Sequence, residues 1–158
     1  MSLVKVRSRG INLADDFAFT GTISGAGGGK VGQVVTVTKT STFSTTSTGM
    51  TGVTGFTADI TPTATSSKVL VIVTCGTFQN DNGNARALMQ VVRGSTNITA
   101  GDAATGEEVG SAICGRTNDG AHHQFATTIS VLDSPNTTSS TTYTVQACRG
   151  PDAAGVVN

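Results

Sequence analysis

The residues able to do acid–base or metal chemistry are few in this chain and poorly placed for it. His122 and His123 are its only two histidines. Adjacent residues of a strand point to opposite faces, so this pair cannot hold one metal ion between them. Asp119 and Glu107 could add carboxylates, but no recognised metal-ligand spacing accompanies them. We therefore expect no metal site, and we interpret the two histidines as a loop-to-strand pair at an exposed edge.

Patterns for nucleophilic, phosphate-binding and glycosidase chemistry are equally weak. Cys114 with either histidine is a conceivable nucleophile, but it stands in no motif known to activate a thiol. The SGAGGGK string over 24–30 lacks the first glycine of a phosphate-binding loop and the hydroxyl residue that should follow Lys30. Glu107 and Glu108 are adjacent, with no partner acid to form a glycosidase pair. The sequence predicts a protein that is not an enzyme, with no catalytic residue and no cofactor.

The three cysteines, Cys75, Cys114 and Cys148, are widely spaced and each lies beside strand-like sequence. We interpret them as buried free thiols, although one disulfide with one leftover thiol stays open. The first ten residues are basic but lack the apolar stretch of a signal peptide, which favours synthesis in a cytoplasm.

Composition excludes several classes of protein. The chain has 158 residues, including 28 Thr, 14 Ser and 20 Gly, and only 13% of its residues are charged. Its net charge of zero leaves no basic stripe for nucleic acid. The longest apolar run, residues 69–73, is far too short to span a membrane. With 17 Val, 7 Ile, 6 Phe and 5 Leu, the chain is apolar enough to fold, and its branched residues favour strands.

Strand-like runs alternate with turns from residue 31 onward. Lys68–Thr74 is apolar on both faces at its centre, which predicts a strand covered on both sides. A tight turn is expected at 81–84 and one possible helical turn at 103–109. The other predicted strands cover 33–40, 56–60, 86–92, 97–100, 111–114, 122–132 and 142–147. This pattern predicts an all-β fold, with a single β-sandwich or jelly-roll-like domain over residues 30–158.

Residues 1–29 read as an extended N-terminal arm that ends in a glycine-rich hinge. Such a segment buries little surface by itself, so we expect it to dock on another protein. Three basic residues would pair with carboxylates of the docking partner, namely Lys5, Arg7 and Arg9. Four apolar residues would supply the hydrophobic contacts, namely Ile11, Leu13, Phe17 and Phe19.

The polar faces of the predicted strands carry Thr and Ser in place of the usual Lys and Glu. Between residues 31 and 80 only Lys39, Asp59 and Lys68 are charged. Threonine faces pack on one another through their methyl groups, whereas charged faces stay solvated. We expect a homo-oligomer, most simply a trimer. The alternative to an oligomer is an exposed surface whose low charge keeps it from interacting with its surroundings.

Several strings, in their order along the chain, resemble virion-surface and tail-fibre proteins of bacteriophages, particularly aquatic ones. They are GINLADDFAFTGT at 10–22, KVGQVV at 30–35, TSTFSTTS at 40–47, ITPTATSSKVLV at 60–71, RGST at 93–96, LDSP at 132–135 and TTY at 141–143. The resemblance implies a β-sandwich, commonly trimeric, displayed outside the particle, and it supplies no catalytic or metal-binding residue. We expect no extended shaft or distal domain after Asn158, and this expectation favours a capsid decoration protein or a short fibre module.

The expected function is therefore that of a virion structural protein on the particle surface, whose arm docks on a capsid or tail protein. A second hypothesis is a module that binds glycans of the host surface through its polar loops at 79–86 and 101–124. The residues that would bond sugar hydroxyls are Asn82, Asn84, Asp102, Asp119 and His122. These loops lack an aromatic platform for a sugar ring unless Phe78 or Phe125 is exposed.

Overall fold

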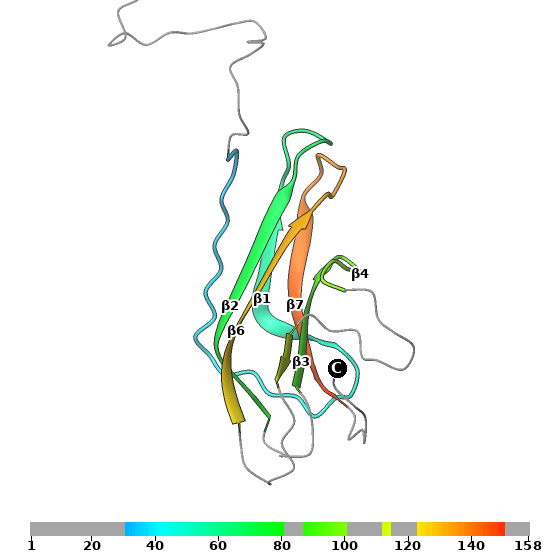
Figure 1. Cartoon of the computed structure of the whole chain (residues 1–158). Coiled ribbons are helices and arrows are strands. Elements are labelled where there is room, and N and C mark those ends of the chain that lie inside the picture. The colour runs from blue at the N-terminus through cyan, green and yellow to red at the C-terminus, as the bar shows by residue number, and fades with distance from the viewer. Residues whose placement is uncertain (1–30, 81–86, 101–111, 115–122, 151–158) are drawn as a thin grey trace, which may run out of the picture. The chain divides into compact units, whose positions relative to one another are not determined.

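The computed structural model describes residues 31–80, 87–100, 112–114 and 123–150 (Figure 1). The chain divides into two units, Met1–Val31 and Gly32–Asn158, and the fold below is that of the second unit. The expected docking arm, the turn at 81–84 and the helical turn at 103–109 lie outside the described residues.

The described residues form β-strands and no helix, which confirms the all-β prediction. The high content of Val, Ile and Thr accounts for this, because branched side chains fit a pleated strand better than a helix. The strands are β1 (Thr51–Ile60), β2 (Val69–Asn80), β3 (Ala87–Arg93), β4 (Thr96–Asn97), β5 (Ala112–Cys114), β6 (His123–Asp133) and β7 (Thr141–Arg149).

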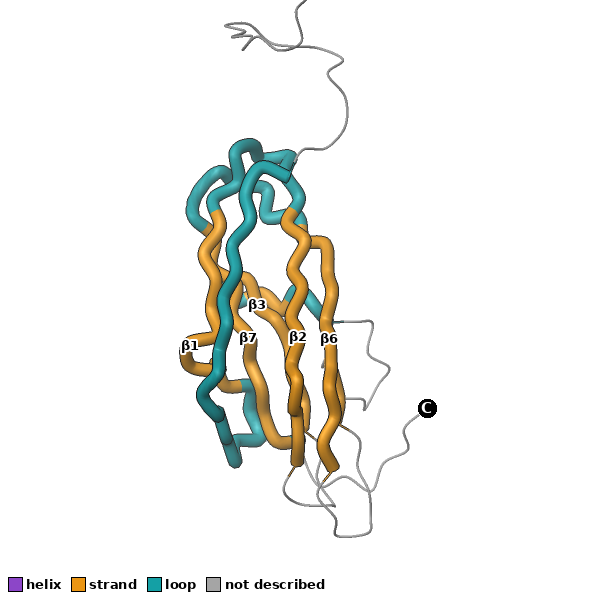
Figure 2. Tube along the Cα trace, turned by 90° about the vertical axis from the view of Figure 1, so that its left-hand side faces the viewer, coloured by secondary structure: helices purple, strands orange, loops and turns teal. Residues whose placement is uncertain are grey.

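The strands form two antiparallel sheets in a sandwich-like arrangement (Figures 1 and 2). Sheet A has the order β1-β7-β3-β4, and β5 also pairs with β3. Sheet B contains only β2 and β6, which pair in register from Val69 with Asp133 to Cys75 with Thr127. The two sheets enclose one core of apolar side chains: Val53, Val69, Val73, Met89, Val91, Ile129, Tyr143, Val145 and Ala147.

Alternation along the strands decides which side chains enter this core. On β7 the buried residues include Tyr143, Val145 and Ala147, as the sequence pattern predicts. On β1, Phe56 and Ile60 pack against the core from its margin, and the strand ends before Pro62 as expected. The strand predicted at 111–114 is also present, as β5, whereas that at 97–100 shortens to the two residues of β4.

The prediction of a strand at 33–40 is wrong. Residues 31–46 make no ladder pairing, and they run as an extended segment beside the edge that β1 and β2 form (Figure 2). Two contacts hold this segment: the Gln33 side chain accepts a hydrogen bond from the Thr61 amide at 3.0 Å, and Phe43 packs against the core. Alternating Val and Thr suit a strand, but a strand also needs a partner with free backbone groups.

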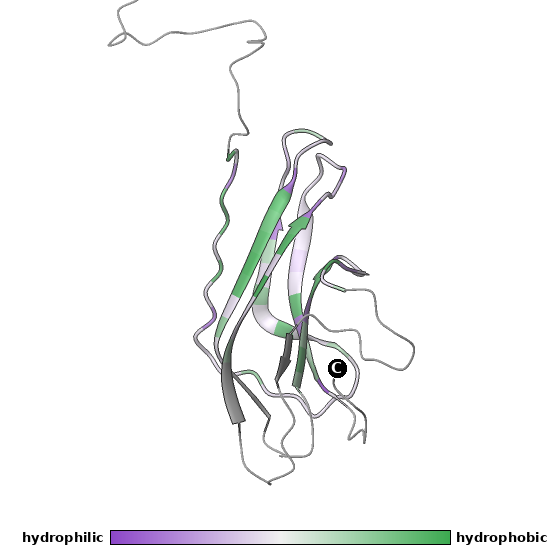
Figure 3. Ribbon diagram, in the orientation of Figure 1, coloured by the Kyte–Doolittle hydropathy of each residue, from purple (hydrophilic) through white to green (hydrophobic). Residues whose placement is uncertain are grey.

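The prediction that residues 68–74 are covered on both sides is also wrong. One face of β2 packs Val69 and Val73 into the core, but the other face leaves Leu70 and Ile72 exposed. The strand buried on both faces is β3, whose first six residues are all buried. The hydropathy colouring shows that β2 is apolar over much of its length (Figure 3). Only the burial of its side chains shows which of its faces this chain covers.

Candidate functional site

The most distinctive surface feature of the described residues is the outer face of sheet B. Leu70 and Ile72 of β2 and Leu132 of β6 are 60%, 61% and 63% exposed. Leu70 and Leu132 are direct cross-strand partners, and Ile72 lies two residues further along the same face. Three large apolar side chains therefore form one contiguous exposed patch, a feature that marks interaction surfaces.

Hydroxyl residues continue this face along the strands. Ile72 pairs with Ser130, and Thr74 pairs with Thr128, whose hydroxyl lies 3.4 Å from that of Thr74. We call the six residues together the sheet B face: Leu70, Ile72, Thr74, Thr128, Ser130 and Leu132. None of the six is charged, and at the nearby end of the sheet the Lys68 amine donates to the Ser134 hydroxyl at 2.6 Å.

On the inner side, a charged cluster ties the two sheets together beneath this face. The Tyr143 hydroxyl of β7 donates to Asp133 Oδ2 of β6 at 2.7 Å. Arg93 Nε of β3 lies 2.8 Å from the same oxygen as an ion pair. Burial raises the pKa of the Tyr143 hydroxyl, and its hydrogen bond to Asp133 raises it further. The cluster joins β6 to sheet A through the Tyr143 hydrogen bond and the Arg93 ion pair, and we call it the structural clamp, although the buried Arg93 Nε makes no hydrogen bond within it.

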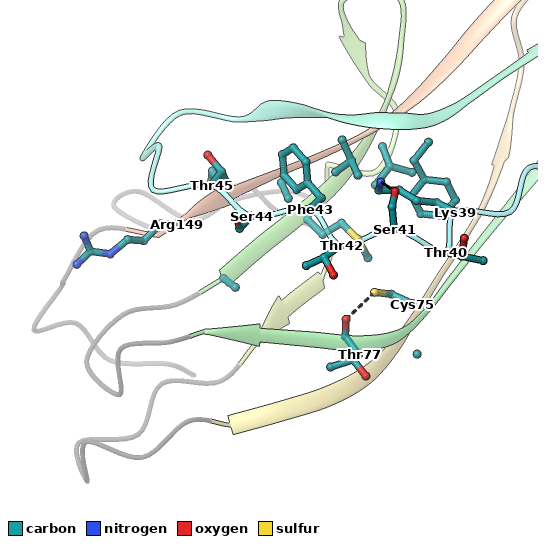
Figure 4. A pocket seen from close by; sticks show the side chains of 18 of the residues that line it. Lys39, Thr40, Ser41, Thr42, Phe43, Ser44, Thr45, Cys75, Thr77 and Arg149 are labelled. Atoms are coloured by element: carbon teal, nitrogen blue, oxygen red, sulfur yellow. Dashed lines mark hydrogen bonds between the residues drawn. The ribbon is translucent and has the colours of Figure 1, made fainter.

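A cleft of about 1290 Å³ opens between the sheets, beside the extended segment (Figure 4). Residues 39–46 form one wall, residues 74–77 of β2 form another, and Met89, Val145 and Ala147 of sheet A also line the cleft. The wall formed by residues 39–46 is rich in hydroxyl groups and carries the Phe43 ring. Cys75 also lines the cleft, and its thiol donates to the Thr77 carbonyl at 3.2 Å.

The structure tests little of the predicted site. The expected docking residues and the expected recognition residues lie outside the described residues: Lys5, Arg7, Arg9, Ile11, Leu13, Phe17, Phe19, Asn82, Asn84, Asp102, Asp119 and His122. Cys75 is a free thiol, and Cys148 is buried. Within the described ranges no three His, Cys, Asp or Glu side chains gather as metal ligands. That same part of the chain holds no helix able to cross a membrane.

Sequence reasoning missed the sheet B face, although its signal was present. The run over 69–73 is apolar at every position, which requires cover for both faces of the strand. Within the described residues the core covers only one of them. Comparison of the chain with protein-family models, with curated proteins and with solved structures gives no match.

Proposed function

We propose that this chain is a non-enzymatic structural protein of a bacteriophage particle, displayed on the virion surface. In this proposal the β-domain is a jelly-roll-like sandwich that forms a homo-oligomer, and the arm of residues 1–29 docks on a capsid or tail protein. A capsid decoration protein or a short fibre module would have these parts.

The observation that carries the proposal is the apolar and uncharged outer face of sheet B. A protein that acts alone in solution normally keeps the outer face of an antiparallel sheet polar. Here Leu70, Ile72 and Leu132 occupy that face, so the domain is built to contact other macromolecules. The resemblance of several ordered strings in the sequence to those of phage surface proteins supports the proposed location on a virion.

Deletion of residues 1–22 tests the docking arm. We expect the truncated protein to stay folded and oligomeric but to be absent from purified particles, since the domain would lose its attachment. The full-length chain carrying the same affinity tag is the control. Normal incorporation of the truncated protein would overturn the docking role, and absence of the full-length protein from particles would overturn the virion location.

The cleft supports a second candidate function, binding of a host-surface glycan. Its wall at 39–46 presents hydroxyl groups that can bond sugar hydroxyls, and Phe43 supplies an aromatic ring. A glycan array with the full-length chain should then give binding that Thr42→Val, at an exposed hydroxyl of this wall, weakens while far-ultraviolet circular dichroism stays unchanged. Absence of any hit at millimolar sugar would exclude this function and leave the structural role as the remaining one.

A further inference from the structure

The sheet B face changes in character along its strands. Its first row is Leu70 with Leu132, the next is Ile72 with Ser130, and the last is Thr74 with Thr128. Apolar side chains therefore lie at one end and hydroxyl groups at the other. In Figure 3 the same trend appears as the hydrophobic colour at the start of β2, which fades along the strand.

The face has no charge with which to select a charged partner. β2 contains no charged residue, and the one acidic residue of β6, Asp133, points inward to Arg93 and Tyr143. Basic proteins, acidic proteins, nucleic acid and anionic membranes all lack complementarity to such a surface. An equally uncharged surface of mixed methyl and hydroxyl groups does complement it, and another copy of this chain supplies one.

The direction of packing follows from the change along the strands. Two faces packed antiparallel would set the Leu70 row against the Thr74 row, which buries hydroxyl groups against hydrocarbon. Faces related by an axis parallel to the strands bring equal rows together. Leucine then packs on leucine, and threonine hydroxyls meet threonine hydroxyls that can pair with them.

The width of the face bears on the number of copies. Two strands spaced about 4.8 Å apart make a strip roughly 10 Å wide. A flat contact between two such strips is narrow, whereas three strips around one axis each contact two neighbours. Closed cyclic symmetry of this kind also leaves no apolar strip exposed.

We propose that the sheet B faces of three copies pack around a three-fold axis parallel to β2 and β6, with equal rows at equal heights. This assignment rests on the oligomerisation in the proposed function, and it adds which face forms the interface and in which direction. The extended segment, the cleft and sheet A would all lie away from the axis.

Cysteine cross-linking of the full-length chain tests the direction. Leu70→Cys and Ile72→Cys should each give a disulfide-linked dimer on mild oxidation, because equal rows meet at the axis. The Ile72 row would meet itself in either direction, so Leu70→Cys is the variant that decides the direction. A mixture of Leu70→Cys and Thr74→Cys proteins should give no mixed dimer. The unmodified chain controls for its native cysteines. A mixed dimer formed between the two different variants, with none from Leu70→Cys alone, would overturn the parallel arrangement.

Analytical ultracentrifugation of Ile72→Lys tests the face itself. Because Ile72 is exposed, the variant should keep its fold, while burial of a lysine should weaken association on the order of a hundredfold. The matched control is Val34→Lys, at an exposed valine outside sheet B that should stay trimeric. If Ile72→Lys remains a trimer and Ile72→Cys forms no cross-link, this interface is refuted but the oligomer is not. If the wild-type chain is a monomer at every concentration, the oligomer is refuted as well, but the docking role of the arm is not.

A trimer in which Ile72→Cys forms a cross-link only after deletion of residues 1–22 would show that the arm, and not a second sheet, covers the face. That result would also overturn the inference.

Discussion

Replacement of Tyr143 by phenylalanine removes one hydroxyl from the clamp between the sheets and leaves the ring in the core. The Tyr143 side chain is 5% exposed, and its hydroxyl donates to Asp133 Oδ2 at 2.7 Å. A hydrogen bond to a charged group contributes about 1.5–3 kcal/mol to stability. Arg93 still faces the carboxylate in the variant, so Asp133 keeps one partner. We therefore expect Tyr143→Phe to lower the free energy of unfolding by about 2 kcal/mol at neutral pH.

The same variant has a distinct pH dependence. Burial and the bond to Asp133 raise the pKa of Tyr143 above its ordinary value of 10.0. Above pH 10 the unfolded tyrosine releases its proton while the folded one keeps it, so the stability due to this group is complete below pH 10 and is lost as pH rises. Between pH 9.5 and pH 11 the wild type should lose about 1.2 kcal/mol more than Tyr143→Phe does.

Two measurements check this reasoning. Urea unfolding followed by far-ultraviolet circular dichroism gives the stability difference at each pH. Because the chain has one tyrosine and no tryptophan, the near-ultraviolet absorbance of phenolate reports Tyr143 alone. The control is Thr57→Val, which removes an exposed hydroxyl contact to Thr144 and should change stability by about 0.5 kcal/mol or less. The clamp would be refuted if Tyr143→Phe changed the free energy of unfolding by only about 0.5 kcal/mol or less. Phenolate formation at pH 10 in the native protein would also refute it.

Three further predictions concern the stability of the β-domain, each measured by the same unfolding assay. Val91, 1% exposed, is the most buried core residue among those the structure describes, so Val91→Ala should cost about 2–3 kcal/mol, whereas Val34→Ala, at an exposed position, should cost almost nothing. Gly94 has a φ of 59° in open space, so Gly94→Ala should cost about 1 kcal/mol through the backbone alone, and Gly94→Asn less; equal costs would contradict this cause. Asn97 donates to the buried Gln90 side chain at 2.7 Å and accepts from the Thr99 amide, so Asn97→Ala should cost about 1–3 kcal/mol, and no loss would show that water replaces these bonds.

The strands that could be predicted share a simple physical property. On β7 the buried Tyr143, Val145 and Ala147 alternate with Thr and Gln, so period and hydropathy indicate the same face. On β6 the buried Ile129 lies between the exposed Thr128 and Ser130. The alternation of apolar and polar residues did not predict strands correctly where strand formation depended on a pairing partner. The 33–40 run alternates as well as β7 does, yet it has no ladder partner, and pairing depends on segments distant in sequence.

The candidate site shows the same division. The apolar character of residues 69–73 is present in the sequence, as is the lack of charge between residues 31 and 80. The sequence does not show which of these apolar residues are exposed, because their exposure depends on which face of β2 packs against sheet A. Register then adds Leu132, about sixty residues away, to the same patch as Leu70. No spacing in the sequence links these two residues.

The amino-acid sequence by itself therefore determined the fold class, the low charge and the absence of a recognisable catalytic pattern, because these follow from residue type and local period. Tertiary structure decided that β3 and not β2 is the strand covered on both faces, and that Arg93, Asp133 and Tyr143 meet between the sheets. Those outcomes depend on long-range antiparallel pairing, in which a one-residue change of register turns every side chain to the opposite face.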